Sequence, residues 1–181
     1  MKTLKPLLCA LTVIACSATS GCSKSAKSAD VVSSVRAGMA QAGLTEVTTK
    51  QDLDKGVLTL GGHVPADADK DRAETIAKTL AGTQVVANEI AVIPPGSEAE
   101  ARKVNSSLDK GIENNLEAAL VGEKLSESVR YSVKNHVVTL TGDVNSPVIR
   151  ARAETIAGGV LNVQQVVNEL QVKKQKATST N

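Results

Sequence analysis

A repeat with an offset of 80 residues constrains this chain more than any other feature. The segment 57–92 aligns without gaps with the segment 137–172. The clearest shared run, Arg-Ala-Glu-Thr-Ile-Ala, begins at Arg72 in one copy and at Arg152 in the other. A gapless match of this density predicts two copies of one folding unit.

Each copy shows the same succession of hydrophobic patterns. Apolar residues at helical spacing predict an early helix and, after a hairpin, a second helix. These residues are Val31, Val32, Val35 and Met39, then Ala73, Ile76, Ala77 and Leu80, in the first copy, and Ile112, Leu116, Ala119 and Leu120, then Ala153, Ile156, Ala157 and Val160, in the second. A final strand is predicted at 84–92 and at 164–172.

The hairpin between the two helices is clearer in the second copy. Val129, Tyr131 and Val133 alternate with polar residues there, ahead of a turn at 135–136 and a returning strand at 137–144. In the first copy, the constant offset of 80 predicts which residues correspond to these three, ahead of a turn at 54–56. These counterparts are Thr49, Gln51 and Leu53.

The order α-β-β-α-β in each copy predicts an α+β fold. Because a helix joins the last two strands, these strands should pair in parallel with a right-handed crossover. We therefore expect two tandem modules, each a three-stranded mixed sheet covered on one face by two helices. The predicted modules span 30–92 and 105–173, and a linker at 93–104 carries Pro94-Pro95-Gly96, which neither a helix nor a central strand accommodates.

The first 22 residues are typical of an export signal. Lys2 and Lys5 precede an apolar run at 6–15, which is shorter than the roughly 20 residues of a membrane-spanning helix. All three cysteines lie in this segment, so we expect no disulfide in the modules. Residues 23–29 are predicted to form a tether and residues 174–181 a disordered tail.

This segment resembles a bacterial lipoprotein signal, in which small residues precede a cysteine that becomes lipid-modified. We favour Cys22 as the lipidated residue, because a polar stretch follows it directly. Cys16 fits the preceding residues of the motif better but leaves a short signal. An ordinary secreted protein cut near Ala18 is the remaining alternative.

Composition argues against nucleic-acid binding. Without Lys2 and Lys5, the count of basic residues falls from 21 to 19, which equals the 19 acidic residues. Nucleic-acid binders cluster an excess of Lys and Arg, and single-strand binders stack bases on aromatic rings. Tyr131 is the sole aromatic residue of the chain. We therefore expect no nucleic-acid partner.

The sequence offers no set of catalytic residues. His63 and His136 occupy non-equivalent places in the two copies and are predicted to be exposed hairpin residues. No common nucleophile, zinc or phosphate-loop motif is present. Gly62 and Gly142, where a strand ends, are predicted to serve the backbone rather than a ligand. We expect no enzyme, no cofactor and no metal site.

The two copies differ most at the start of their second helices. The first copy carries acidic residues there, Asp67, Asp69 and Asp71, whereas the second carries apolar and basic ones. Exposed aliphatic side chains beside Arg can enter a lipid headgroup layer and pair with phosphates. The predicted lipid-contact residues are Val148, Ile149, Arg150 and Arg152. The alternative is that Val148 and Ile149 pack against the neighbouring module.

Three motifs in each copy resemble the BON domain, a small module of bacterial periplasmic proteins. The family pattern combines V-x-L-x-G-x-V, A-x-x-I-A and V-x-N-x-L-x-V. In the second copy these motifs are 138–144, 153–157 and 166–172, and the first copy matches them closely at 57–64, 73–77 and 86–92. The layout is similar to that of dual-BON envelope lipoproteins.

The resemblance implies a non-enzymatic periplasmic protein that supports envelope integrity or stress tolerance. Its implied partners are membrane phospholipid, which we expect to be anionic, and other envelope proteins. A chaperone-like holdase for exported proteins is the alternative function. Ser23-Lys24 after Cys22 lacks an acidic residue, which by the same resemblance fits anchoring in the outer membrane.

Overall fold

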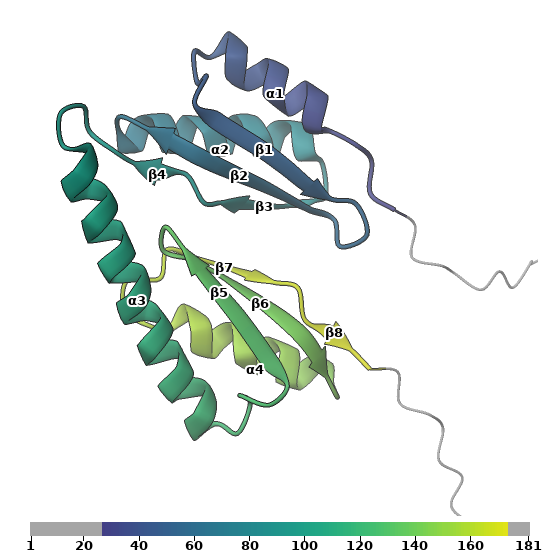
Figure 1. Ribbon diagram of the computed structural model, residues 1–181. Coiled ribbons are helices and arrows are strands. Elements are labelled where there is room, and N and C mark those ends of the chain that lie inside the picture. The colour runs from purple at the N-terminus through teal and green to yellow at the C-terminus, as the bar shows by residue number, and fades with distance from the viewer. Residues whose placement is uncertain (1–26, 174–181) are drawn as a thin grey trace, which may run out of the picture.

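The computed structural model describes residues 27–173. Figure 1 shows two modules of similar architecture, connected along one side by a long helix. The predicted export signal with Cys16 and Cys22, the first part of the tether and the predicted tail lie outside the described residues.

The predicted order α-β-β-α-β is confirmed in both modules. The first module contains α1 (Val32–Gln41), β1 (Val47–Asp52), β2 (Val57–Val64), α2 (Asp67–Ala81), β3 (Val85–Asn88) and β4 (Ala91–Val92). The second contains α3 (Glu98–Gly122), β5 (Val129–Lys134), β6 (Val137–Val144), α4 (Pro147–Gly158), β7 (Gln165–Asn168) and β8 (Gln171–Val172). In each sheet the first two strands are antiparallel and the last pairing is parallel, as expected.

The final strand of each module is interrupted, which the sequence pattern did not predict. β3 and β4 both pair with β2, and two residues between them leave the regular ladder. Asn88 Oδ1 accepts a hydrogen bond from the Ile90 amide at this break. Asn168 Oδ1 accepts a hydrogen bond from the Leu170 amide in the same way. The repeated Asn therefore shapes the strand by side-chain-to-backbone hydrogen bonding.

The expected hairpin counterparts are wrong by two residues. Val47 pairs with Gly62 and Val129 pairs with Gly142, so Val129 corresponds to Val47 rather than to Thr49. The cause is loop length. Four residues, 53–56, connect β1 to β2, whereas two residues, 135–136, connect β5 to β6. Accordingly, Tyr131 and Val133 correspond to Thr49 and Gln51.

Each module has its own hydrophobic core between its helices and one face of its sheet. The predicted helix residues Val35, Met39, Ala73 and Ala77 are buried in the first core, and Ile112, Leu116, Leu120, Ala153 and Ala157 are buried in the second. Strand residues such as Leu58 and Leu140 complete the two cores. Burying small alanines lets helix and sheet approach closely without aromatic side chains.

The helix α3 is longer than its module requires. It begins at Glu98, so the segment 98–104, expected to belong to the linker, is helical. Only 93–97 lies between β4 and α3. The first buried residue of α3 is Ile112, and no residue from 98 to 111 is buried. The first half of α3 therefore extends beyond the second core, toward the first module.

The two sheets meet through the faces that their own helices leave uncovered, and we call this contact the module seam. Its apolar centre is a separate cluster of four buried residues from both modules: Val57, Ala87, Val137 and Val167. By the repeat offset, Val57 corresponds to Val137 and Ala87 to Val167. The seam therefore joins nearly equivalent surfaces.

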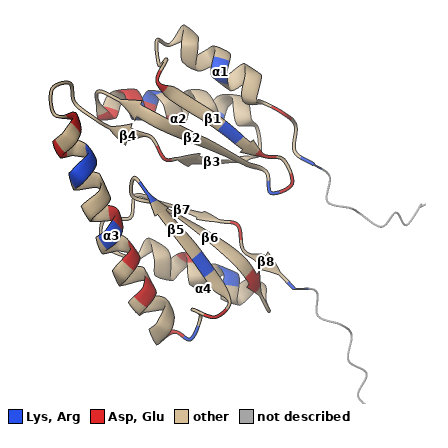
Figure 2. Cartoon of the chain, in the orientation of Figure 1, with Lys and Arg blue, Asp and Glu red and all other residues tan. Residues whose placement is uncertain are grey.

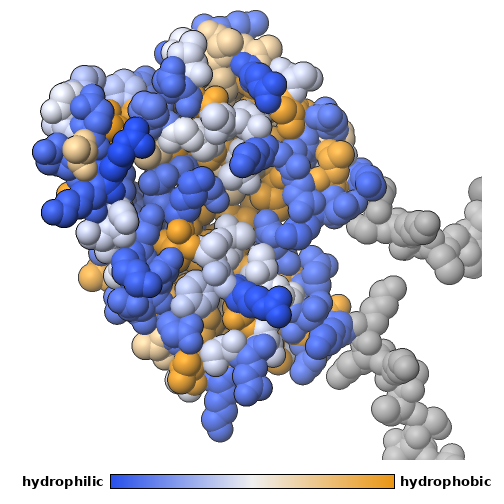
Figure 3. Space-filling view, viewed as in Figure 1, coloured by the Kyte–Doolittle hydropathy of each residue, from blue (hydrophilic) through white to orange (hydrophobic). Residues whose placement is uncertain are grey.

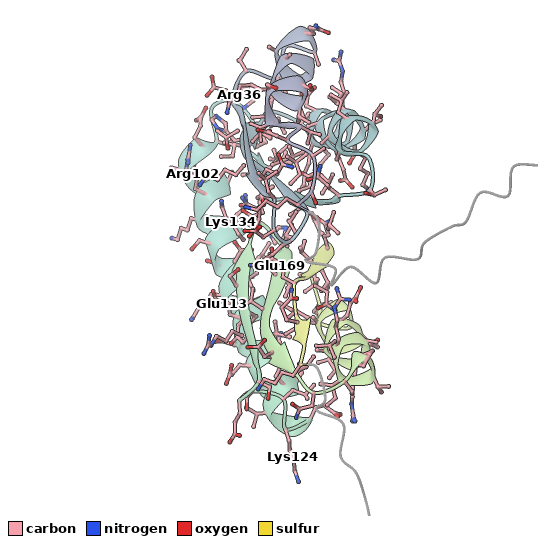
Figure 4. All side chains as sticks on the ribbon, turned by 90° about the vertical axis from the view of Figure 1, so that its right-hand side faces the viewer. Arg36, Arg102, Glu113, Lys124, Lys134 and Glu169 are labelled. Atoms are coloured by element: carbon pink, nitrogen blue, oxygen red, sulfur yellow. The ribbon has the colours of Figure 1, made fainter. Side chains whose placement is uncertain are left out.

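Polar side chains surround the apolar centre of the module seam. The Gln165 side chain donates a hydrogen bond to Val86 O at 2.6 Å and accepts one from the Asn88 amide at 2.9 Å. These bonds pair backbone groups on the edge of β3 that faces away from β2. Lys55 of the β1–β2 loop binds Glu169, and Lys134 of β5 binds Glu89 at 3.0 Å. In Figure 4, Lys134 and Glu169 lie at the level where the modules meet.

Candidate membrane-contact site

The first turn of α4 is built by local signals. Ser146 has extended backbone angles, and its hydroxyl accepts a hydrogen bond from the Ile149 amide at 3.3 Å. Pro147 occupies the first turn, where the missing amide hydrogen costs nothing. This capped start fixes the direction in which the next side chains project. The equivalent helix α2 begins after Ala66, whose side chain cannot cap it.

Three of the four predicted lipid-contact residues, Val148, Arg150 and Arg152, are exposed, and Ile149 is partly buried. Val148 is 76% exposed, and Arg152 is exposed at the next turn, where it binds Glu123 of α3. Ile149 instead packs against the core of its own module. Arg150 Nη2 donates to Asn168 O at 3.0 Å, which ties α4 to the end of β7. The alternative of packing on the neighbouring module is wrong for both apolar residues.

The outer face of α4 carries fewer charges than that of α2. Val148, Ala151, Thr155 and Gly158 lie on one exposed stripe of α4. The matched residues of α2 are Ala68, Asp71, Thr75 and Lys78. Figure 2 shows acidic residues gathered at the start of α2. The start of α2 therefore repels an anionic surface more strongly than the start of α4 does.

The start of α4 lies on the side of the molecule that also holds both ends of the described chain. Near the N-terminus, the Ser28 amide donates to Leu53 O at 2.9 Å, which holds the chain against the β1–β2 loop. Lys55 of that loop reaches Glu169, close to β8. Val172 in β8 pairs with Val144, directly before α4. Figure 1 shows both ends of the described chain on this side.

The two histidines are not exposed, contrary to expectation. Both are half-buried where the modules approach each other. His63 lines a groove of about 570 Å³ between α3 and the ends of β2 and β5. The His136 amide donates to Asp109 Oδ1 at 2.8 Å, and its Nε2 is buried without a hydrogen-bond partner. No group of three metal-ligating side chains gathers anywhere between residues 27 and 173.

Exposed apolar side chains are scattered over both modules. Figure 3 shows hydrophilic residues over most of the viewed face, with apolar ones in small separate spots. The large exposed ones among the described residues are Leu80, Val85, Val104, Val121, Val148, Leu161 and Val172. No helix within 27–173 is both long enough and apolar enough to cross a membrane.

Comparison with known proteins matches both modules. The BON domain profile matches residues 27–94 and 108–174. Osmotically-inducible protein Y of Escherichia coli (strain K12) is 30% identical over 132 residues, which cover 71% of this chain and 63% of that protein. The chain thus spans somewhat less than two thirds of this relative's length.

Two solved structures of CdsD, a structural protein of the type III secretion system of Chlamydia trachomatis, are also similar. One is its C-terminal domain, with a TM-score of 0.33, 14% identity and coverage of 80% of this chain and 98% of that one. The other has a TM-score of 0.36 and 14% identity, and covers 80% of this chain and 93% of that one. The duplicated motifs, the two α-β-β-α-β modules and the two profile matches agree: the chain belongs to the BON-domain family and carries two BON domains in tandem.

Proposed function

We propose that this protein is a non-enzymatic periplasmic lipoprotein that binds anionic phospholipid through the start of α4. The observation that carries the proposal is that this helix start and the N-terminal end of the described chain lie on the same side of the molecule (Figure 1). Residue 28 is held at the β1–β2 loop, whose Lys55 binds Glu169 of the second module, and the following strand β8 pairs with Val144 shortly before α4. An acyl anchor at the N-terminus then brings this end of the molecule to the membrane.

The length of the tether supports the same orientation. Lys27 is the fifth residue after Cys22, and an extended chain spans about 3.4 Å per residue, so the two residues are at most about 17 Å apart. An acyl chain on Cys22 would hold Lys27, the first described residue, within about that distance of the headgroups. Such tethering raises the local concentration of lipid, so a weak contact by Val148 and Arg152 suffices.

The family supports the envelope as the site of action. The BON domain is associated with phospholipid, and a relative is named as osmotically inducible. We propose that the chain supports envelope integrity under stress, anchored in the outer membrane. Envelope proteins are the second class of partner, at a surface that the anchor leaves free.

Vesicle co-sedimentation tests the lipid contact without the anchor. Residues 23–181, which include every described residue, are mixed with anionic or zwitterionic vesicles at low and high salt. We expect binding to anionic vesicles only, weakened at least about threefold by high salt because Arg–phosphate attraction is screened. Absence of binding to either lipid would overturn the proposed contact and leave an acyl chain as the membrane link.

A matched pair of variants locates the contact. Val148→Asp with Arg152→Asp places two carboxylates on the exposed start of α4 and should reduce anionic-vesicle binding about tenfold or more. Ala68→Asp with Arg72→Asp makes the same change at the equivalent positions of α2 and should leave binding unchanged. Equal loss in both variants would contradict the assignment to α4. Ile149 and Arg150 are left intact because they pack on the core and hold the end of β7. Because Arg152→Asp also breaks the ion pair with Glu123, urea unfolding must show that both double variants are equally folded.

A further inference from the structure

The module seam is close to two-fold symmetric, because both modules contribute equivalent positions. Val57 and Ala87 meet Val137 and Val167, their counterparts under the repeat offset. Such a contact resembles the isologous interface of a symmetric dimer, in which the same patch serves on both sides. Here the two patches belong to one chain.

The ion pairs of the seam are reciprocal as well. Each module extends a hairpin lysine to the glutamate at the strand break of the other: Lys55 to Glu169 and Lys134 to Glu89. The two carboxylates are largely buried, with 11% and 17% of their side chains exposed. Because docking removes water from each glutamate, the docked module must supply a lysine to offset that cost, which makes the seam selective for a matching module.

The seam is narrow and has hollows beside it. Hollows of about 280 Å³ and 230 Å³ lie beside the Lys70–Gln164 hydrogen bond, and the groove of about 570 Å³ borders α3. Its buried apolar centre consists of four small or medium side chains. Separating the modules therefore exposes little apolar surface, and the contact depends strongly on its polar pairs.

The covalent connection between the modules permits them to separate. Residues 93–97 contain Pro94, Pro95 and Gly96, and this segment lies outside helix and strand. The following stretch of α3, 98–111, contains no buried residue. Swinging α3 away from the first module would therefore break the seam but neither core.

We propose that two copies of this chain exchange modules through the seam. In the exchanged dimer, the first module of each copy docks on the second module of the other, and every seam contact is re-formed between chains. Domain exchange needs no new interface, so its cost is limited to bringing two chains together. This proposal is independent of membrane binding and is tested without lipid.

Complementary charge reversal tests the exchange on residues 23–181. Variant A carries Lys55→Glu with Glu89→Lys, and variant B carries Lys134→Glu with Glu169→Lys. Within either variant alone, both seam pairs become like-charged, in the closed chain and in the exchanged homodimer. In an exchanged dimer of A with B, all four pairs are again of opposite charge. Size-exclusion chromatography with light scattering gives the mass of each sample.

We expect A and B alone to be monomeric, and their mixture to form a dimer with an affinity at least tenfold higher than either self-association. Far-UV circular dichroism verifies that both variants remain folded. A control reverses Lys110 and Glu113, a pair on α3 outside the seam, and should stay monomeric alone and when mixed with the wild type. A mixture of folded A and B that remains monomeric would overturn the proposal. So would self-association of A or B alone with the same affinity as the mixture.

Discussion

Asn88 Nδ2 lies 2.9 Å from Glu74 Oε2, and the same contact recurs between Asn168 and Glu154, also at 2.9 Å. The hydrogen bond connects two motifs of the repeat, the helix motif that contains Glu74 and the strand motif that contains Asn88. It fastens the second helix of each module to the break in the last strand. The repetition of these residues therefore follows from the architecture of the module.

Asn88→Asp should destabilise the first module. Asn88 is 3% exposed, so the new carboxylate would lose the donor to Glu74 and repel that residue in a poorly solvated place. We expect the free energy of unfolding in urea at neutral pH to fall by about 2 kcal/mol. Part of this loss should return near pH 4, where a carboxyl is protonated. Asn114→Asp on the exposed face of α3 is the control and should change stability little.

Gly62→Ala should be more damaging than an ordinary strand substitution. Gly62 has φ +87°, and a Cβ there would lie 2.0 Å from Glu46 O. The expected backbone role of this glycine is thus confirmed, and we expect a loss of about 2–3 kcal/mol in urea unfolding. Gly111→Ala in α3 meets nothing within 4 Å and should instead stabilise by about 0.5–1 kcal/mol. Equal effects of the two changes would contradict this account.

Lys134→Ala should weaken the module seam. It leaves Glu89, whose side chain is 17% exposed, without its cation, although Lys134 itself is 60% exposed and screened by water. We expect the free energy of unfolding to fall by about 1–2 kcal/mol, and small-angle scattering to show a larger radius of gyration. Lys110→Ala removes an exposed pair on α3 and should cost less than about 0.5 kcal/mol. Unchanged stability and size in Lys134→Ala would show that this pair does not hold the seam.

Tyr131, the sole aromatic residue, provides a spectroscopic probe of the second module. Burial, together with its hydrogen bond to Glu117 at 2.8 Å, raises the pKa of Tyr131 to about 12. Because the pKa is higher in the folded state, this contribution to stability is complete below the ordinary value of 10 and is lost as pH rises through 12. Absorbance titration at alkaline pH should show this midpoint, and Glu117→Gln should lower it. A midpoint near 10 with folded protein would contradict the described contact.

Much of the fold was predictable because local patterns repeat. The helix periods, the hairpin in each module and the parallel crossover follow from hydrophobic spacing and the handedness rule. The hairpin counterparts were misplaced because a constant offset hides the difference between a four-residue loop and a two-residue loop. Glu154 illustrates the same limit: four residues on, the helix offers only Gly158, and its partner Asn168 comes from a strand.

The candidate site was predictable in its position but not in its side chains. The contrast between the acidic start of α2 and the apolar, basic start of α4 is visible in the sequence. Helical pitch then decides which side chains project into solvent. Ala153 and Ala157 face the core, and Ile149, one turn earlier on the same face, is partly buried with them. Val148 and Arg152 remain exposed on the outer side.

By itself, the sequence determined the modules: their number, their element order and the cores that hydrophobic periodicity brings together, since these depend on contacts within about 65 residues. The module seam was decided by the tertiary structure. Glu89 and Glu169 look like ordinary strand residues until two sheets are stacked and the hairpin lysines reach across. Partners between modules carry no signal in local spacing, because docking depends on the shape of complete surfaces.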